Sequence, residues 1–136
     1  PETDYYRTFH RMVGHGLPAA LLIALLAGAL GQRARVVAIS AFISVHLHFL
    51  CDLLGSRGNG AEDLWGIYYF APFTTAHELS WTGQWPLVGW QNMAITAALL
   101  GVVCLRATAT GYSPLVVLSA RADAVFVATL RSWRRK

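Results

Sequence analysis

Two short polar clusters interrupt otherwise apolar sequence, and both contain residue types that bind metal ions. The first, HRMVGH, contains His10 and His15, and the second, HLHFLCD, contains His48 and Asp52. Imidazole nitrogens and carboxylate oxygens are common ligands of zinc, manganese and iron. A metal with an open coordination position can activate water for hydrolysis. These residues predict a divalent metal site, with zinc the most suitable ion and manganese or iron as alternatives.

The spacing within the second cluster favours one pair of ligands over its neighbours. On a helix, His48 and Asp52 project from the same face, one turn apart. His46 points about 200° away from His48, and we expect it to form a hydrogen bond with a neighbouring helix. Cys51 and Cys104 are expected to be small apolar side chains without a disulfide between them, because they lie at opposite ends of their apolar runs.

The two clusters are predicted to lie at similar depth in a pair of helices. A turn between the first two apolar runs lies near Arg33. His15 comes about 18 residues before this turn, and His48 and Asp52 come about 15 and 19 residues after it, at a rise of about 1.5 Å per residue. If the helices pack antiparallel, these three side chains meet near one boundary, and His10 arrives from just above. For each histidine alone, an ordinary hydrogen-bonded residue near a helix end remains the alternative.

Composition indicates the environment of these helices. The 136 residues are 55% hydrophobic and only 13% charged, and the mean hydropathy is positive. This is typical of a membrane protein, whereas a soluble domain of this size needs more polar residues to cover its surface. We therefore predict an all-α fold, an integral membrane helical bundle that forms a single membrane domain over residues 1–136.

Apolar runs of about 20 residues suit a membrane span. None of the runs here is wholly apolar, so the buried core helices of a soluble protein are the alternative. A signal peptide is not expected at the start, because no small-residue cleavage site follows the first run. The predicted parts are three spans over residues 12–30, 36–54 and 86–105, an outer aromatic segment over 55–85, and a cytoplasmic tail over 106–136 with an interfacial amphipathic helix over 114–130.

Charge predicts the orientation of these spans. Arg33 and Arg35 lie in the short loop after the first span, and most other basic residues follow the third. The positive-inside rule places both segments in the cytoplasm, which leaves the histidines on the outer side. Nucleic acid is not an expected partner, because the basic tail lacks interleaved aromatic residues. Membrane lipid is the expected partner.

The outer segment combines aromatic residues with a flexible turn. Its tryptophans, tyrosines and phenylalanines are expected to form an interfacial belt, to line a groove for lipid, or both. Within the turn SRGNG, Arg57 is either an ordinary solvated arginine or a ligand for a phosphate or carboxylate group.

Several of these motifs resemble the YdjM-like family of membrane proteins described as metal-dependent hydrolases. The resemblance covers nearly the whole chain, and the motifs that carry it are HRMVGHGL, HLHFLCDLLGSRG, LWGIYYFAPF, WQNMAIT and GYSPLVVLSARADAVFVATLR. It implies a helical, multi-pass protein of the bacterial inner membrane. It also implies metal binding by His10, His15, His48 and Asp52, and hydrolysis of an unspecified substrate.

The chain departs from this family pattern at two places. Gly14 stands where the family commonly has threonine before the second histidine. The family's acidic PDxD-type motif is matched only by Pro1-Glu2-Thr3-Asp4, so we expect another helix and further carboxylate ligands upstream of this chain.

Three functions follow as hypotheses. The leading one is a metal-dependent hydrolase at the outer membrane surface that acts on a lipid-linked ester or phosphoester. In it, Asp4 or Glu2 is an extra ligand or general base, and Arg57 stabilises developing negative charge. The alternatives are a haem-binding electron carrier that uses His15 and His48, and a noncatalytic membrane scaffold whose polar cluster locks helices together.

Overall fold

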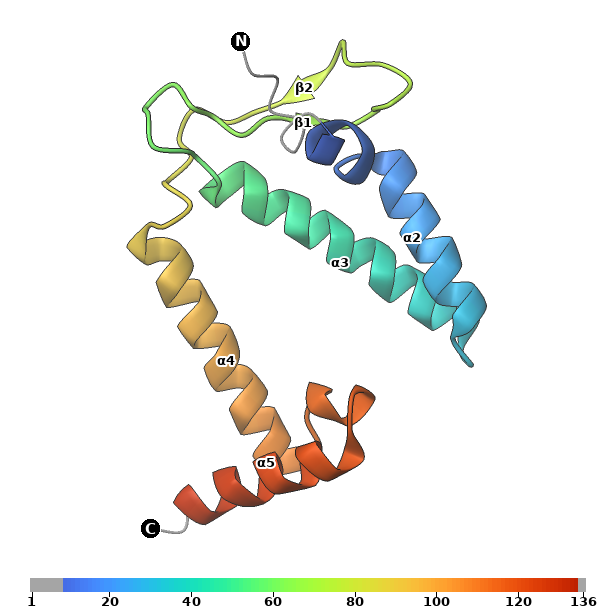
Figure 1. Cartoon of the computed structure of the whole chain (residues 1–136), viewed down its shortest axis with the longest axis vertical. Helices are drawn as coiled ribbons and strands as arrows, with labels where there is room; N and C mark the ends of the chain where they lie inside the picture. The colour runs from blue at the N-terminus through green and yellow to red at the C-terminus, as the bar shows by residue number, and fades with distance from the viewer. Residues whose placement is uncertain (1–8, 135–136) are drawn as a thin grey trace. The chain divides into compact units, whose positions relative to one another are not determined.

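The computed structural model describes residues 9–134 and is mostly helical in this range (Figure 1). The all-α fold class predicted from the sequence is confirmed. The helical elements are the π-helical turn η1 His10–Gly14, α2 Leu17–Leu30, α3 Ala34–Gly55, α4 Trp90–Thr110, the 3-10 helix η2 Pro114–Val117 and α5 Ala120–Trp133. Two short antiparallel strands, β1 Ile67–Tyr68 and β2 Glu78–Leu79, pair Ile67 with Leu79 between α3 and α4.

Contacts within the chain divide it into two compact units, with the boundary after Gly89. The first unit contains η1, α2, α3 and the two strands, and the second contains α4, η2 and α5. The single membrane domain over 1–136 stays a prediction.

The first predicted span is interrupted near its start. We expected a continuous run over 12–30, but α2 begins at Leu17, after an extended residue at Gly16 with φ −157° and ψ 172°. Pro18 explains this break, because its ring prevents a helix from continuing through it and favours the first turn of a new helix. At 14 residues and about 1.5 Å per residue, α2 alone is shorter than a typical span.

The other two predicted spans correspond to long apolar helices. Among the described residues, α3 with 22 residues and α4 with 21 are long and apolar enough to cross a membrane. α3 extends slightly beyond the expected range 36–54. α4 begins and ends several residues later than the expected 86–105, because the chain turns at Pro86, whose carbonyl accepts a hydrogen bond from Gly89 N. Most of their apolar side chains are exposed, an arrangement that is costly in water and favourable in lipid.

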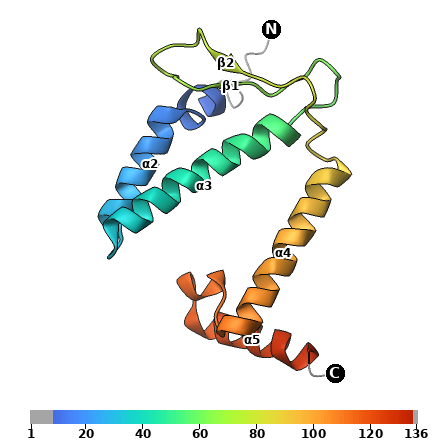
Figure 2. The same cartoon turned by 180° about the vertical axis from the view of Figure 1, so that it is seen from behind.

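Small residues on one face of α2 allow α3 to pack closely. Ala20, Ala24 and Gly28 lie one turn apart and are the buried residues of this helix. A Cβ added to Gly28 would lie 3.0 Å from both the carbonyl oxygen of Ala34 and the Cβ of Ala38. Small residues at such spacing bring membrane helices together, and the two helices lie side by side in both views (Figure 2).

An apolar core joins this helix pair to the outer segment. Ala20, Phe49 and Ile67, one each from α2, α3 and β1, form the buried cluster. The backbone N–H of Leu17 donates to the carbonyl of Tyr69 at 2.7 Å. A Cβ at Gly16 would lie 2.9 Å from the same carbonyl oxygen, so the close approach of the outer segment to the start of α2 requires glycine there.

The second unit folds back on itself after α4. The predicted amphipathic helix over 114–130 is divided into η2 and α5, with Ser119 between them in an extended conformation. The Ser119 hydroxyl accepts a hydrogen bond from Ala122 N and so caps α5. Asp123 is buried against Ser113, and α5 is the most amphipathic of the helices in the described range.

Replacing Gly28 with valine should separate α2 from α3. Its side chain would meet the backbone of α3, and overpacking of this kind costs about 1–3 kcal/mol. Thermal unfolding of the purified protein in detergent measures the loss. Ala29→Val is the matched control because Ala29 is the exposed neighbour on the same helix. Equal unfolding temperatures for the two variants would contradict the close packing described above.

Candidate metal centre

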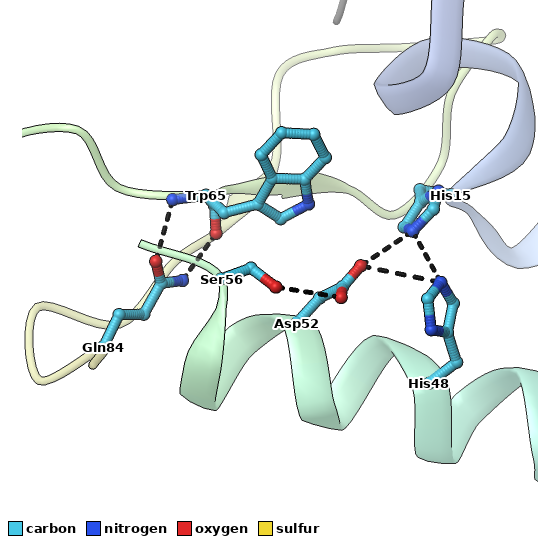
Figure 3. Close-up of polar contacts among 6 residues, drawn as sticks. All are labelled: His15, His48, Asp52, Ser56, Trp65 and Gln84. Carbon is cyan, nitrogen blue, oxygen red and sulfur yellow. Dashed lines mark hydrogen bonds and ion pairs between the residues drawn. The ribbon is translucent and has the colours of Figure 1, made fainter. Parts of the chain in front are cut away.

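Three side chains from two separate segments of the first unit, the link before α2 and the last turns of α3, meet at one point (Figure 3). Nε2 of His15 lies 2.8 Å from Oδ2 of Asp52 and 3.0 Å from Nε2 of His48. Nε2 of His48 lies 3.7 Å from the same Oδ2. The three potential ligand atoms therefore face one another, and the structure brings together three of the four ligands predicted from the sequence.

Local structure explains how each side chain reaches this point. His48 and Asp52 lie one turn apart on α3, so their side chains share a face. His15 follows the last residue of η1 and has a non-helical conformation, with φ −116° and ψ 62°. It therefore lies in the link between η1 and α2, and the close packing of α2 against α3 brings it to Asp52.

Exposure differs strongly among the three side chains. The exposed fraction is 4% for His15, 15% for Asp52 and 56% for His48. The cluster is thus closed on the His15 side and open on the His48 side. An open side is what a site needs for a ligand to enter, whereas a closed structural site would bury every ligand.

The chemistry of the three atoms fits a cation between them. Nε2 of His15 can carry one proton, so it cannot form a full hydrogen bond with both the carboxylate and the second imidazole. A divalent cation would interact favourably with a lone pair from each residue. Ligands about 2.0–2.1 Å from tetrahedral zinc lie about 3.3 Å from each other, and the three separations of 2.8, 3.0 and 3.7 Å lie on either side of this value.

Ser56 orients the carboxylate of Asp52. Its hydroxyl donates a hydrogen bond of 3.0 Å to Oδ1, the oxygen that does not face the histidines. Oδ2 is therefore left to the cluster (Figure 3). Such contacts behind a ligand hold its orientation and support metal affinity. Sequence spacing alone could have indicated Ser56, because it lies one turn after Asp52.

His46 lies outside the cluster and has its own partners. Its Nδ1 lies 2.9 Å from the carbonyl of Phe42 and its Nε2 lies 3.0 Å from the hydroxyl of Tyr69. Because the carbonyl only accepts, Nδ1 carries the proton and Nε2 accepts from Tyr69. The expected partner was on a neighbouring helix. Tyr69 instead belongs to the outer segment, so His46 helps to hold that segment on α3.

Trp65 and Gln84 form a contact that sequence reasoning missed. The buried side chain of Gln84 accepts a hydrogen bond from Trp65 N at 2.8 Å and donates one to Trp65 O at 2.6 Å (Figure 3). The Trp65 ring lies edge-on to the His15 ring, with 6.4 Å between centroids. Gln84 therefore fixes an indole that packs beside a candidate ligand.

Arg11 holds the same indole from the side of η1. Its Nη2 donates to the carbonyl of Leu64 at 3.1 Å. Its guanidinium carbon lies 4.8 Å from the centre of the Trp65 ring, within the range of a cation–π contact. These contacts join the residues just before His15 to the outer segment.

The aromatic residues of the outer segment have two environments. Trp65 and Tyr69 are partly buried and pack against the core cluster. Phe73 and Trp81 are exposed, as expected for aromatic side chains at a membrane interface.

The other predicted site residues lie elsewhere or outside the described part. Arg57 forms backbone hydrogen bonds with Trp85 and Leu87. Within residues 9–134, no contact is seen between its side chain and the cluster of His15, His48 and Asp52. His10 begins η1, but its side chain is outside the described residues. Glu2 and Asp4 also lie outside them.

Comparison with protein families agrees with the membrane character of the helices. The model of a family described as YdjM inner membrane protein matches residues 2–133. The chain belongs to this family. Membership places it among inner membrane proteins, in agreement with the exposed apolar surfaces of α3 and α4. No curated protein and no solved structure shows significant similarity to the chain.

Replacing Gln84 with leucine should weaken the first unit. The change would remove the Gln84 side chain to which the backbone N–H and C=O of Trp65 are hydrogen-bonded. Each of these groups that stays buried away from water would lower the free energy of unfolding by about 1–3 kcal/mol. Thermal unfolding, followed by tryptophan fluorescence, reports the loss. Gln32→Leu is the control, because Gln32 is exposed in the turn between α2 and α3. An unchanged unfolding temperature for Gln84→Leu would show that the pairing contributes little.

Proposed function

We propose that this chain is a metal-dependent hydrolase at the outer surface of the inner membrane, acting on a lipid-linked ester or phosphoester. The convergence of His15, His48 and Asp52 is the observation that carries the proposal. These groups match the two-histidine and one-carboxylate sets that hold catalytic zinc. Zinc is the preferred ion, and manganese and iron use the same ligand types.

Each residue of the cluster has a role in this proposal. His15, His48 and Asp52 hold the ion, and His10 is a fourth candidate ligand. A bound divalent ion would supply a Lewis acid that activates water and polarises the substrate. Ser56 holds the carboxylate in orientation, and Trp65 covers the His15 side and limits access of bulk water there.

The exposed side of the cluster supports an amphiphilic substrate. His48 is 56% exposed and lies on an apolar helix whose apolar side chains are mostly exposed as well. An acyl chain can lie along this apolar surface while its headgroup reaches the ligands. Within this proposal, Arg57 binds a negatively charged headgroup, and Asp4 or Glu2 serves as general base or additional ligand. The outward orientation rests on the basic loops of the sequence.

Haem binding is less compatible with this geometry. Axial ligands of a haem lie on opposite faces of the porphyrin. Here the two Nε2 atoms lie 3.0 Å apart and share Asp52 as a neighbour, which leaves no space for a porphyrin between them. A noncatalytic scaffold remains the alternative, in which the three groups only link α2 to α3.

Substitutions of the cluster should remove the metal. In the purified full chain loaded with zinc, His48→Ala and Asp52→Asn should each weaken binding by at least about tenfold, since changes merely behind the ligands cost that much. Chelator competition followed by elemental analysis measures this. His77→Ala is the control, because this histidine lies in the exposed outer segment and should bind metal as the unchanged protein does.

The same variants test hydrolysis. The zinc-loaded chain should release product from phospholipids or other lipid phosphates in detergent micelles, and His48→Ala should abolish this activity. Full metal content in both His48→Ala and Asp52→Asn would refute the ligand assignment. Zinc binding that depends on the cluster, but with no hydrolysis of any lipid ester, would refute the hydrolase proposal. Absence of bound zinc in the unchanged chain would favour the scaffold.

A further inference from the structure

The second unit has positive charge that its own carboxylate does not neutralise. From Trp90 onward, Asp123 is the sole acidic residue of the sequence. It is buried, and its Oδ1 accepts hydrogen bonds from Ser113 N at 2.8 Å and Ser113 Oγ at 2.6 Å. The basic residues from Trp90 onward are Arg106, Arg121, Arg131, Arg134, Arg135 and Lys136. Because Asp123 is engaged within the unit, this charge is available to an anionic partner.

Arg131 is held in a defined position at the end of α4. Its Nε donates a hydrogen bond of 3.0 Å to the carbonyl of Thr108, in the last turn of α4, where a cation is favourable. Within residues 9–134 its two Nη atoms form no hydrogen bond, so their N–H groups can reach a ligand. A guanidinium fixed through Nε is prepared for a paired interaction with a phosphate.

Gly111 leaves space beside this guanidinium. Its φ of 85° is a conformation that glycine adopts readily, and a Cβ there would lie 3.2 Å from Nη2 of Arg131. A hollow of about 580 Å³ opens at this place, lined by Gly111, Ala124, Val127, Ala128, Arg131 and Ser132. Most of these residues are small, so the hollow can admit a phosphate group next to the arginine.

We propose that this hollow binds the phosphate of an anionic phospholipid. It lies directly after an apolar helix long enough to cross a membrane, at the level where headgroups would be found. Val117, Leu118 and Trp133 of the same unit are exposed and can enter the acyl region beside the headgroup. These apolar side chains favour a lipid over free phosphate, because a free anion would contact none of them.

The test compares lipids with identical acyl chains and different headgroups. The purified full chain in detergent is titrated with phosphatidylglycerol or phosphatidylcholine, and bound lipid is counted by native mass spectrometry. The unchanged protein should prefer phosphatidylglycerol. Arg131→Gln should reduce this preference about tenfold, since a charge-assisted contact is lost. Arg134→Gln removes the same charge outside the hollow and should leave most of the preference intact.

A second variant distinguishes the contribution of the hollow to lipid preference from that of the positive charge. Ala128→Trp fills the hollow at an exposed position of α5 and keeps every arginine, so it should also reduce the preference. Equal losses in Arg131→Gln and Arg134→Gln, with none in Ala128→Trp, would show diffuse attraction and overturn the proposal. Competition by glycerol phosphate at the same concentration as the lipid would overturn the choice of lipid over a soluble phosphate.

Discussion

Close packing of α2 against α3 is the constraint on which the candidate site depends. Apolar side chains gain little from each other in lipid, so membrane helices associate through close backbone approach and polar contacts. Ala20, Ala24 and Gly28 allow that approach, and it brings His15 within 2.8 Å of Asp52. The polar cluster in turn adds a contact between α3 and the link just before α2, so helix association and the site support each other.

The outer segment holds the helix pair together and covers one side of the candidate site. It contacts the start of α2 through the carbonyl of Tyr69, contacts α3 through the Tyr69 hydroxyl on His46, and places Trp65 beside His15. Gln84 makes this arrangement specific, because it satisfies both backbone groups of Trp65 away from any regular sheet. As a result, the site is open on the His48 side and covered on the His15 side. This asymmetry underlies the proposal of an amphiphilic substrate.

Much of the helical framework could be predicted from the sequence, because it depends on local regularities. Helical periodicity pairs His48 with Asp52, and residue counts from the turn near Arg33 predict that His15 reaches them; the structure places the three together. The interruption before α2 differs from the expected span over 12–30, because Pro18 favours the first turn of a new helix over the middle of a longer one. The roles of Gln84 and Tyr69 depend on contacts between distant segments, for which no period or spacing gives a signal.

The central claim is that His15, His48 and Asp52 bind one metal ion together. X-ray absorption spectroscopy of the zinc-loaded full chain tests it most directly, because the edge and fine structure report the ligand types and distances around the metal. We expect nitrogen and oxygen ligands at about 2.0–2.1 Å, with imidazole scattering that decreases in His48→Ala. A sulfur ligand, or a spectrum unchanged in His48→Ala and Asp52→Asn, would contradict it.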